Sequence, residues 1–119
     1  MRPEQRLRTQ ASFKHLVDKG CFARGVHFYA WTVSRDEIGH GAKRPRPALG
    51  VIVSRRAAAK ATRRNAYKRR IREIFRKHQG SLKQDAVCLI KVRPGGGEAS
   101  FEMMELELIQ LFKKTGAWS

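Results

Sequence analysis

The chain has 119 residues, and its 26 Lys and Arg residues against 10 Asp and Glu residues give a formal net charge of +16. The length suits a single domain over residues 1–119, and a hydrophobic fraction of 41% excludes a disordered basic tail. Because a charge of this size repels itself in a compact chain, it indicates a polyanionic partner, with nucleic acid favoured over an anionic membrane and over a merely solubilising surface.

An amphipathic helix is predicted near the N-terminus, over residues 9–19. Its apolar residues Phe13, Leu16 and Val17 fall at i, i+3 and i+4, which places them on one helix face. Gly20 follows where a left-handed residue often ends a helix.

Strands are predicted next. Residues 27–33 are rich in aromatic and β-branched side chains, with Tyr29, Trp31 and Val33 on one face of the strand. The other predicted elements of this half are a short extra strand near residues 21–26, a loop over 34–47 and a strand over 48–54.

The second half predicts a basic helix over residues 62–78 that closes near Gly80, a strand over 85–93 and a last helix that Ser100 N-caps. Glu102 lies in the first turn of the last helix, where a negative charge is favourable. This helix is expected to bury the stripe Phe101, Met104, Leu108, Leu111 and Phe112. The fold class expected from these elements is α+β, an α/β sandwich in αβββαβα order with helices packed on one sheet.

The basic helix carries two different faces. Eleven of the 26 basic residues lie between Arg55 and Lys77, where Glu73 is the only acid. An apolar stripe, expected to dock on the sheet, consists of Tyr67, Ile71, Ile74 and Phe75, and a polar face of Asn65, Arg69, Arg72 and Arg76 is expected on the opposite side. Lys68 and Arg70 flank the stripe and reach outward over their aliphatic stems.

Such a face suits phosphate, because arginine offers a planar fork of donors and keeps its charge near neutral pH. The free N–H groups near Thr62, Arg63 and Arg64 add a further anion site. Two alternatives need no RNA: a solvated basic helix, which the unbalanced like charges disfavour, and a nuclear-localisation patch, which would not require the apolar stripe.

Other signals bear on compartment and chemistry. Cys21 and Cys88 do not indicate a disulfide framework, and the apolar run around Cys88 predicts a buried reduced thiol. No signal peptide and no apolar run of ~18 residues is visible, so a cytoplasmic protein without membrane attachment is expected. The histidines stand alone, and no carboxylate pair suggests a metal site, a catalytic group or a small-molecule cofactor.

The stretch from Arg64 to Glu73, RNAYKRRIRE, resembles the signature helix of the bacterial ribonuclease P protein component, RNRxKRxxRE. Further likenesses, which together span roughly residues 5–114, lie at Arg6-Leu7, Ser12-Phe13, Gly20, residues 49–56 and residues 85–94. Two departures stand out: Ala66 replaces the second arginine of the signature, and one residue is added between Ser54 and Arg64. The role of the missing arginine is either absent or taken by Arg63.

The resemblance implies a mixed sheet with a left-handed βαβ crossover through the signature helix, against the general rule of handedness. It also implies a subunit that binds a catalytic RNA and the 5′ leader of precursor tRNA, while the RNA and its Mg²⁺ carry out the hydrolysis. The expected contacts to the catalytic RNA are Arg63, Arg64, Asn65, Lys68, Arg69, Arg70, Arg72 and Arg76.

For the leader, the family uses a cleft between the first helix and the sheet, and Phe13, Val17 and Trp31 map onto its wall. Cations at strand ends and before the basic helix are expected to hold leader phosphates; they are Arg55, Arg56, Lys60, Lys91 and Arg93. Core packing is the alternative for Phe13 and Val17, and plain solvated surface the alternative for the cations.

Two other functions compete with this reading. One is a ribosomal or other structural RNA-binding protein of similar fold with no role in cleavage. The other is an autonomous metal-dependent nuclease using acids such as Asp18 or Asp85, which the scarcity of acidic residues disfavours.

Overall fold

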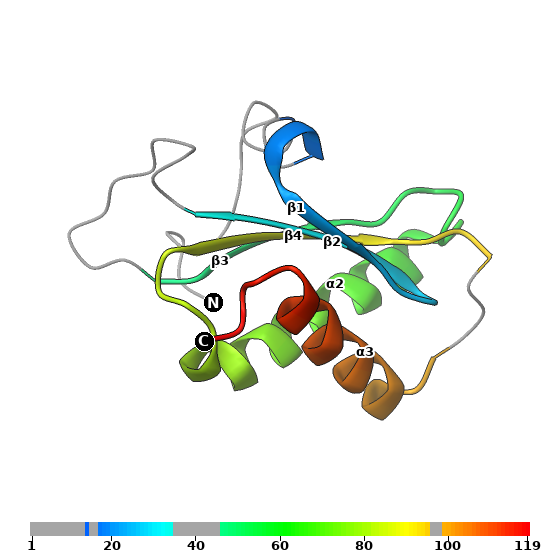
Figure 1. Cartoon of the computed structure of the whole chain (residues 1–119). Helices are drawn as coiled ribbons and strands as arrows, with labels where there is room; N and C mark the ends of the chain where they lie inside the picture. The colour runs from blue at the N-terminus through cyan, green and yellow to red at the C-terminus, as the bar shows by residue number, and fades with distance from the viewer. Residues whose placement is uncertain (1–13, 15–16, 35–45, 96–98) are drawn as a thin grey trace.

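A four-stranded sheet organises the described part of the molecule, with strand order β1-β2-β4-β3 (Figure 1). The computed structural model describes Lys14 and residues 17–34, 46–95 and 99–119. The strands are β1 (Cys21–Arg24), β2 (Phe28–Ser34), β3 (Ala48–Ile52) and β4 (Ala86–Val92), and the helices are α2 (Ala61–His78), the 3-10 turn η3 (Gln79–Ser81) and α3 (Phe101–Lys114).

The sheet is mixed. β1 pairs antiparallel with β2, where Phe22 faces Trp31, and β2 pairs antiparallel with β4. β3 pairs parallel with β4, its chain neighbour beyond α2, so β3, α2 and β4 form a βαβ unit of adjacent strands. The predicted α+β class, the mixed sheet and the short extra strand are therefore confirmed.

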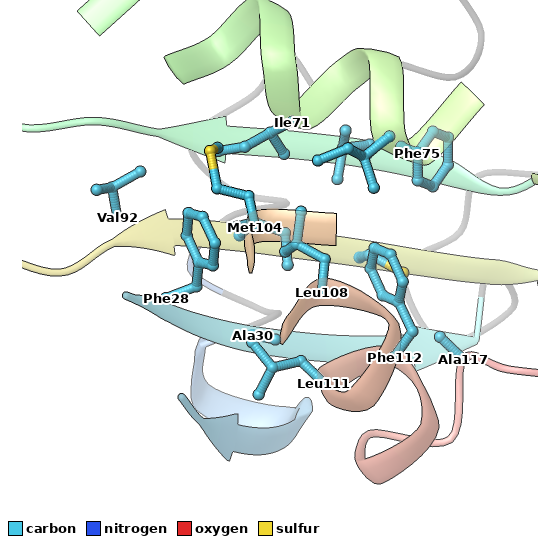
Figure 2. Close-up of a cluster of buried hydrophobic side chains, with 14 of the residues drawn as sticks. Phe28, Ala30, Ile71, Phe75, Val92, Met104, Leu108, Leu111, Phe112 and Ala117 are labelled. Atoms are coloured by element: carbon cyan, nitrogen blue, oxygen red, sulfur yellow. The ribbon is translucent and has the colours of Figure 1, made fainter. Parts of the chain in front are cut away.

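Both long helices cover one face of the sheet (Figure 1). α2 buries Ile71, Ile74 and Phe75 there completely. The side chains of Phe28, Met104, Leu108 and Phe112 fill the space between sheet and helices, as Figure 2 shows. Each such fully buried apolar side chain stabilises the fold by roughly 1.5–3 kcal/mol. This burial, rather than its repelling charges, accounts for the helical state of α2.

The sheet has a smaller apolar cluster on its other face, which we call the open face. Val33, Ala48, Val87 and Leu89 are buried there, and Trp31 and Ile52 pack partly against them. The described part of the first predicted helix, in which Lys14 and residues 17–19 are helical, lies on this side of the sheet (Figure 1). Phe13 and most of the loop predicted over 34–47 lie outside the described residues.

Several predicted boundaries need correction. β3 ends at Ile52 rather than Ser54, because the Ser54 carbonyl already accepts the N–H groups of Ala57 and Ala58 in a turn. Phe101, expected in the buried stripe of α3, is 36% exposed at the first position of the helix, whereas Met104 in the same turn is fully buried. The Ser100 cap is confirmed, with its hydroxyl accepting the N–H of Met103 at 3.2 Å. Tyr67, expected in the apolar stripe of α2 that docks on the sheet, is only partly buried.

Cys88 is buried as predicted, in a small polar network under α3. Burial raises the pKa of the Cys88 thiol to about 12. The Thr32 hydroxyl donates to Thr115 Oγ1 at 2.9 Å, and its oxygen lies 3.7 Å from Cys88 Sγ. Thr115 in turn donates to the Leu111 carbonyl, so the network fastens the end of α3 to the sheet.

Candidate nucleic-acid interface

The outer side of α2 presents the predicted polar face. Asn65, Arg69 and Arg76 are exposed, and Arg72, in the same row, is half-buried. These positions recur at helical spacing opposite Ile71, so the two-faced helix predicted from the sequence is confirmed in its geometry. The first turn of α2 contains no acidic residue, and Glu73 is the only acid on the helix.

The remaining cations of α2 differ in how they are placed. Lys68 is half-buried and Arg70 exposed, and both flank the buried stripe as expected. Arg63 is exposed in the first turn. Arg64 turns back instead, and its Nη1 donates to the carbonyls of Ala58 and Ala59 at 3.0 and 2.9 Å. Arg64 therefore fastens the loop before α2, in addition to any contact with RNA.

The predicted leader cations come together at one end of the sheet. β3 and β4 are parallel, so their carboxyl ends coincide, with Ile52 beside Lys91. The loop from this end to α2 carries exposed cations, and Arg93 follows the end of β4 on the same side (Figure 1). The exposed loop cations are Arg55, Arg56 and Lys60, the last of which is the N-cap residue of α2. Five cations from two segments, the loop before α2 and the end of β4, thus share one end of the fold.

Aromatic rings line the open face of the sheet beside these cations. The Phe22 ring centre lies 5.1 Å from that of Trp31 and 5.8 Å from that of Tyr29, and those of Tyr29 and Trp31 are 6.1 Å apart. Phe22 is 49% exposed, while Tyr29 and Trp31 are half-buried. Lys91 pairs with Tyr29 across β2 and β4. We call Phe22, Tyr29 and Trp31 the aromatic cluster.

Arg93 joins the cluster to the turn between β1 and β2. Its guanidinium carbon lies 5.2 Å from the centre of the Tyr29 ring, and its Nη1 donates to the Gly25 carbonyl at 2.6 Å. Its backbone N–H donates to the His27 carbonyl at 2.8 Å. A cation over a ring face is an electrostatically favourable arrangement. The turn therefore orients Arg93 while leaving part of the guanidinium for other contacts.

Glu107 of α3 holds the same turn from the other side. Its Oε2 accepts the backbone N–H of His27 at 2.9 Å, and its Oε1 lies 2.9 Å from His27 Nδ1. A Cβ at position 25 would lie 2.6 Å from Glu107 Oε2, so a larger residue there would displace the carboxylate from this contact. The turn between β1 and β2 is thus held by the Glu107 carboxylate on one side and by the Arg93 guanidinium on the other.

Val17 is 48% exposed on the helical stretch of the open face, which makes core packing a poor account of it. Phe13, its predicted neighbour on the cleft wall, lies outside the described residues.

Sequence reasoning missed Phe22, because the four-residue β1 shows no periodicity and only its pairing places Phe22 opposite Trp31. It also left Tyr29 out of the site, although the alternation of β2 already put Tyr29 on the face of Trp31.

Within the described ranges, no three His, Cys, Asp or Glu side chains gather as a metal site would require. In the same ranges, no helix has the length and apolar character to cross a membrane.

Comparison with known proteins agrees with the resemblance seen in the sequence. The family model "Ribonuclease P" matches residues 1–116. The ribonuclease P protein component of Dictyoglomus turgidum is 31% identical over 95% of this chain and 90% of its own, and that of Syntrophomonas wolfei is 25% identical over 96% and 89%.

Solved structures of the family share the fold. The RNase P protein of Staphylococcus aureus superposes with a TM-score of 0.81 at 23% identity, covering 97% of this chain and 98% of its own. That of Thermotoga maritima gives a TM-score of 0.75 at 26% identity, covering 92% and 96%. From the family model and the near-full-length relatives together, the chain belongs to the bacterial ribonuclease P protein family.

Proposed function

We propose that this chain, as the protein subunit of ribonuclease P in the 5′ maturation of precursor tRNA, holds two RNA segments on two surfaces. The outer side of α2 binds the catalytic RNA, and the open face of the sheet binds the single-stranded 5′ leader of the substrate. For the catalytic RNA, the contact residues are Arg63, Arg64, Asn65, Lys68, Arg69, Arg70, Arg72 and Arg76. For the leader, they are Phe13, Val17, Phe22, Tyr29, Trp31, Arg55, Arg56, Lys60, Lys91 and Arg93.

The observation that carries the leader assignment is the aromatic cluster with five cations at one end of the sheet. Single-stranded RNA binds to surfaces of this kind because bases stack on exposed rings while Lys and Arg pair with the phosphates. Stacking tolerates any base, since every base has a π-face. A leader whose sequence differs between substrates therefore suits a stacking surface better than it suits a surface that reads base edges.

The division of labour follows the family. Mg²⁺ and the phosphodiester hydrolysis belong to the RNA subunit, and the protein adds affinity and orientation for the substrate. Membership of the family also supports a left-handed β3-α2-β4 crossover, a cytoplasmic location and a single functional domain over residues 1–119. The α2 contacts are expected to be electrostatic, so binding of the catalytic RNA will weaken steeply as salt is raised.

Reconstitution tests this function. A bacterial ribonuclease P RNA is incubated with precursor tRNA at low Mg²⁺, with and without the purified chain, and the rate of 5′ cleavage is measured. The proposal predicts faster cleavage and tighter substrate binding with the chain. Equal rates and affinities would refute it. Binding of the RNA with no change in cleavage would instead support a structural RNA-binding role.

A further inference from the structure

A hollow lies beside Ala66, on the flank of α2 next to the segment that leads into α3. The hollow has a volume of about 240 Å³ and is lined by Arg63, Ala66, Tyr67, Arg70 and Ala99. Four of these residues belong to one row of α2, since residues three and four apart share a helix face. Ala99 comes from the segment that leads into α3 and closes the hollow from the side.

The floor of the hollow is firm and its walls are cationic. Tyr67 and Ala99 are partly buried and pack against the main apolar cluster, so the floor is anchored in the core. Arg63 and Arg70 are exposed on either side, one turn before and one turn after Ala66. An accessible aromatic surface between two guanidinium groups suits one ligand chemistry in particular, a base with phosphates on both sides.

The small side chain of Ala66 keeps this space open. An arginine there, as in the signature of the family, would lie at i+3 from Arg63 and i−4 from Arg70, so it would repel both across the hollow. The surface that this chain presents at position 66 is therefore a concave site for a ligand group rather than a projecting cation.

We propose that the hollow at Ala66 receives one unstacked nucleotide of the catalytic RNA. The base lies on the accessible part of Tyr67, and Arg63 and Arg70 pair with the phosphates on its two sides. This rests on the proposed function, which brings α2 to the catalytic RNA, and it adds a specific site within that contact. A nucleotide of precursor tRNA has the same chemistry, and the test separates the two sources.

The test fills the hollow without removing a charge. Ala66→Leu is the filling variant and Ala66→Ser the matched control, since serine leaves the space nearly unchanged. Ala66→Arg fills the space and adds a charge. Position 66 is half-buried, and leucine is a good helix former, so Ala66→Leu is expected to fold, as thermal unfolding will verify. The dissociation constant of each variant is measured for a bacterial ribonuclease P RNA alone.

We expect about 10-fold weaker binding for Ala66→Leu, because one stacked base contributes roughly that much affinity. Ala66→Ser should bind as the wild type does. Wild-type affinity of Ala66→Leu, or tighter binding by Ala66→Arg, would overturn the proposal. Base-specific chemical probing of the RNA should show a nucleotide protected by the wild type and by Ala66→Ser but not by Ala66→Leu.

A second arm locates the nucleotide. Each variant is assembled with the RNA at saturating concentration, and its affinity for precursor tRNA is measured. A loss confined to this arm would place the nucleotide in the substrate and contradict our assignment to the catalytic RNA. The proposed function itself is judged separately, because it fails only if the wild-type chain neither binds the RNA nor stimulates cleavage.

Discussion

Arg93 and Tyr29 form a cation–π pair at the end of the sheet, with 5.2 Å between the guanidinium carbon and the ring centre. The pair links two surfaces that are distant in the sequence. Arg93 also bonds to the Gly25 carbonyl in the turn between β1 and β2, while Tyr29 contacts Phe22 in the aromatic cluster. The position of a predicted leader cation therefore depends on the turn between β1 and β2.

The aromatic cluster should determine affinity for the leader. Replacing Phe22 by Leu removes an exposed ring and is expected to weaken binding of precursor tRNA by ~1–3 kcal/mol, the value of one stacked base. The affinity of the RNA–protein complex for precursor and mature tRNA checks this. Leu106→Ala, which changes an exposed apolar residue on α3, serves as the control. Equal losses for precursor and mature tRNA would speak against stacking with the leader.

The contact between Glu107 and the turn should contribute to stability. Glu107→Gln weakens an acceptor of the His27 N–H and is expected to lower the free energy of unfolding by ~1–3 kcal/mol. Gly25→Ala should be costly in the wild type, because the new Cβ meets Glu107 Oε2. In a Glu107→Ala background the same Gly25→Ala change should cost little. Urea denaturation of the wild type, of Gly25→Ala, of Glu107→Ala and of the double variant measures the coupling between the two positions. Additive losses of stability would show that they are not coupled.

The two faces of α2 should separate binding from folding. Ile71→Ala is expected to destabilise the domain by ~2–5 kcal/mol, because Ile71 is completely buried. Arg69→Ala should change stability by less than about 0.5 kcal/mol. It should reduce the salt dependence of RNA binding by about 0.7 in log–log slope if the contacted strand is single. If the arginine variant unfolded and the isoleucine variant did not, the faces would be reversed.

Acid should weaken the contact between α2 and α3. Hydrogen bonds from Lys77 and from His78 lower the pKa of Glu105 below its ordinary value of 4.5. A lowered pKa in the folded state means that the carboxylate stabilises the fold at neutral pH, and that this contribution is lost as pH falls from 4.5 through the lowered value. Glu105→Gln should abolish this part of the acid sensitivity, measured by urea denaturation between pH 3 and 7.

Glu73→Gln, at an exposed position on α2, provides the matched control for that change and should keep the wild-type acid profile. An unchanged profile for Glu105→Gln would show that the pair with Lys77 and His78 does not stabilise the fold, despite contact distances of 2.9 Å.

Periodicity predicted most of the fold, because the long elements repeat their apolar residues over several turns. The buried stripe of α2 and the alternation of β2 could be assigned this way. Features that depend on contacts between distant segments could not be predicted from periodicity. Phe22 joins the site only through the register of β1 with β2. Arg64 turns back to the loop before α2, a placement that its position in a basic run does not indicate.

The contact between Glu107 and His27 could likewise not be predicted from the sequence, because 80 residues separate the two positions. The cations of the leader site lie in two segments, and their convergence depends on the parallel pairing of β3 with β4. The family resemblance supplied the residues of the site, whereas the aromatic cluster and its connection to the turn required the folded chain.

The central claim is that the protein recognises the leader. It is tested most directly by the ratio of affinities for precursor and mature tRNA, measured for the catalytic RNA with and without the chain. We predict that the chain tightens binding of precursor tRNA and leaves mature tRNA unchanged, so the ratio rises. The same change for both tRNAs would show that the open face does not bind the leader.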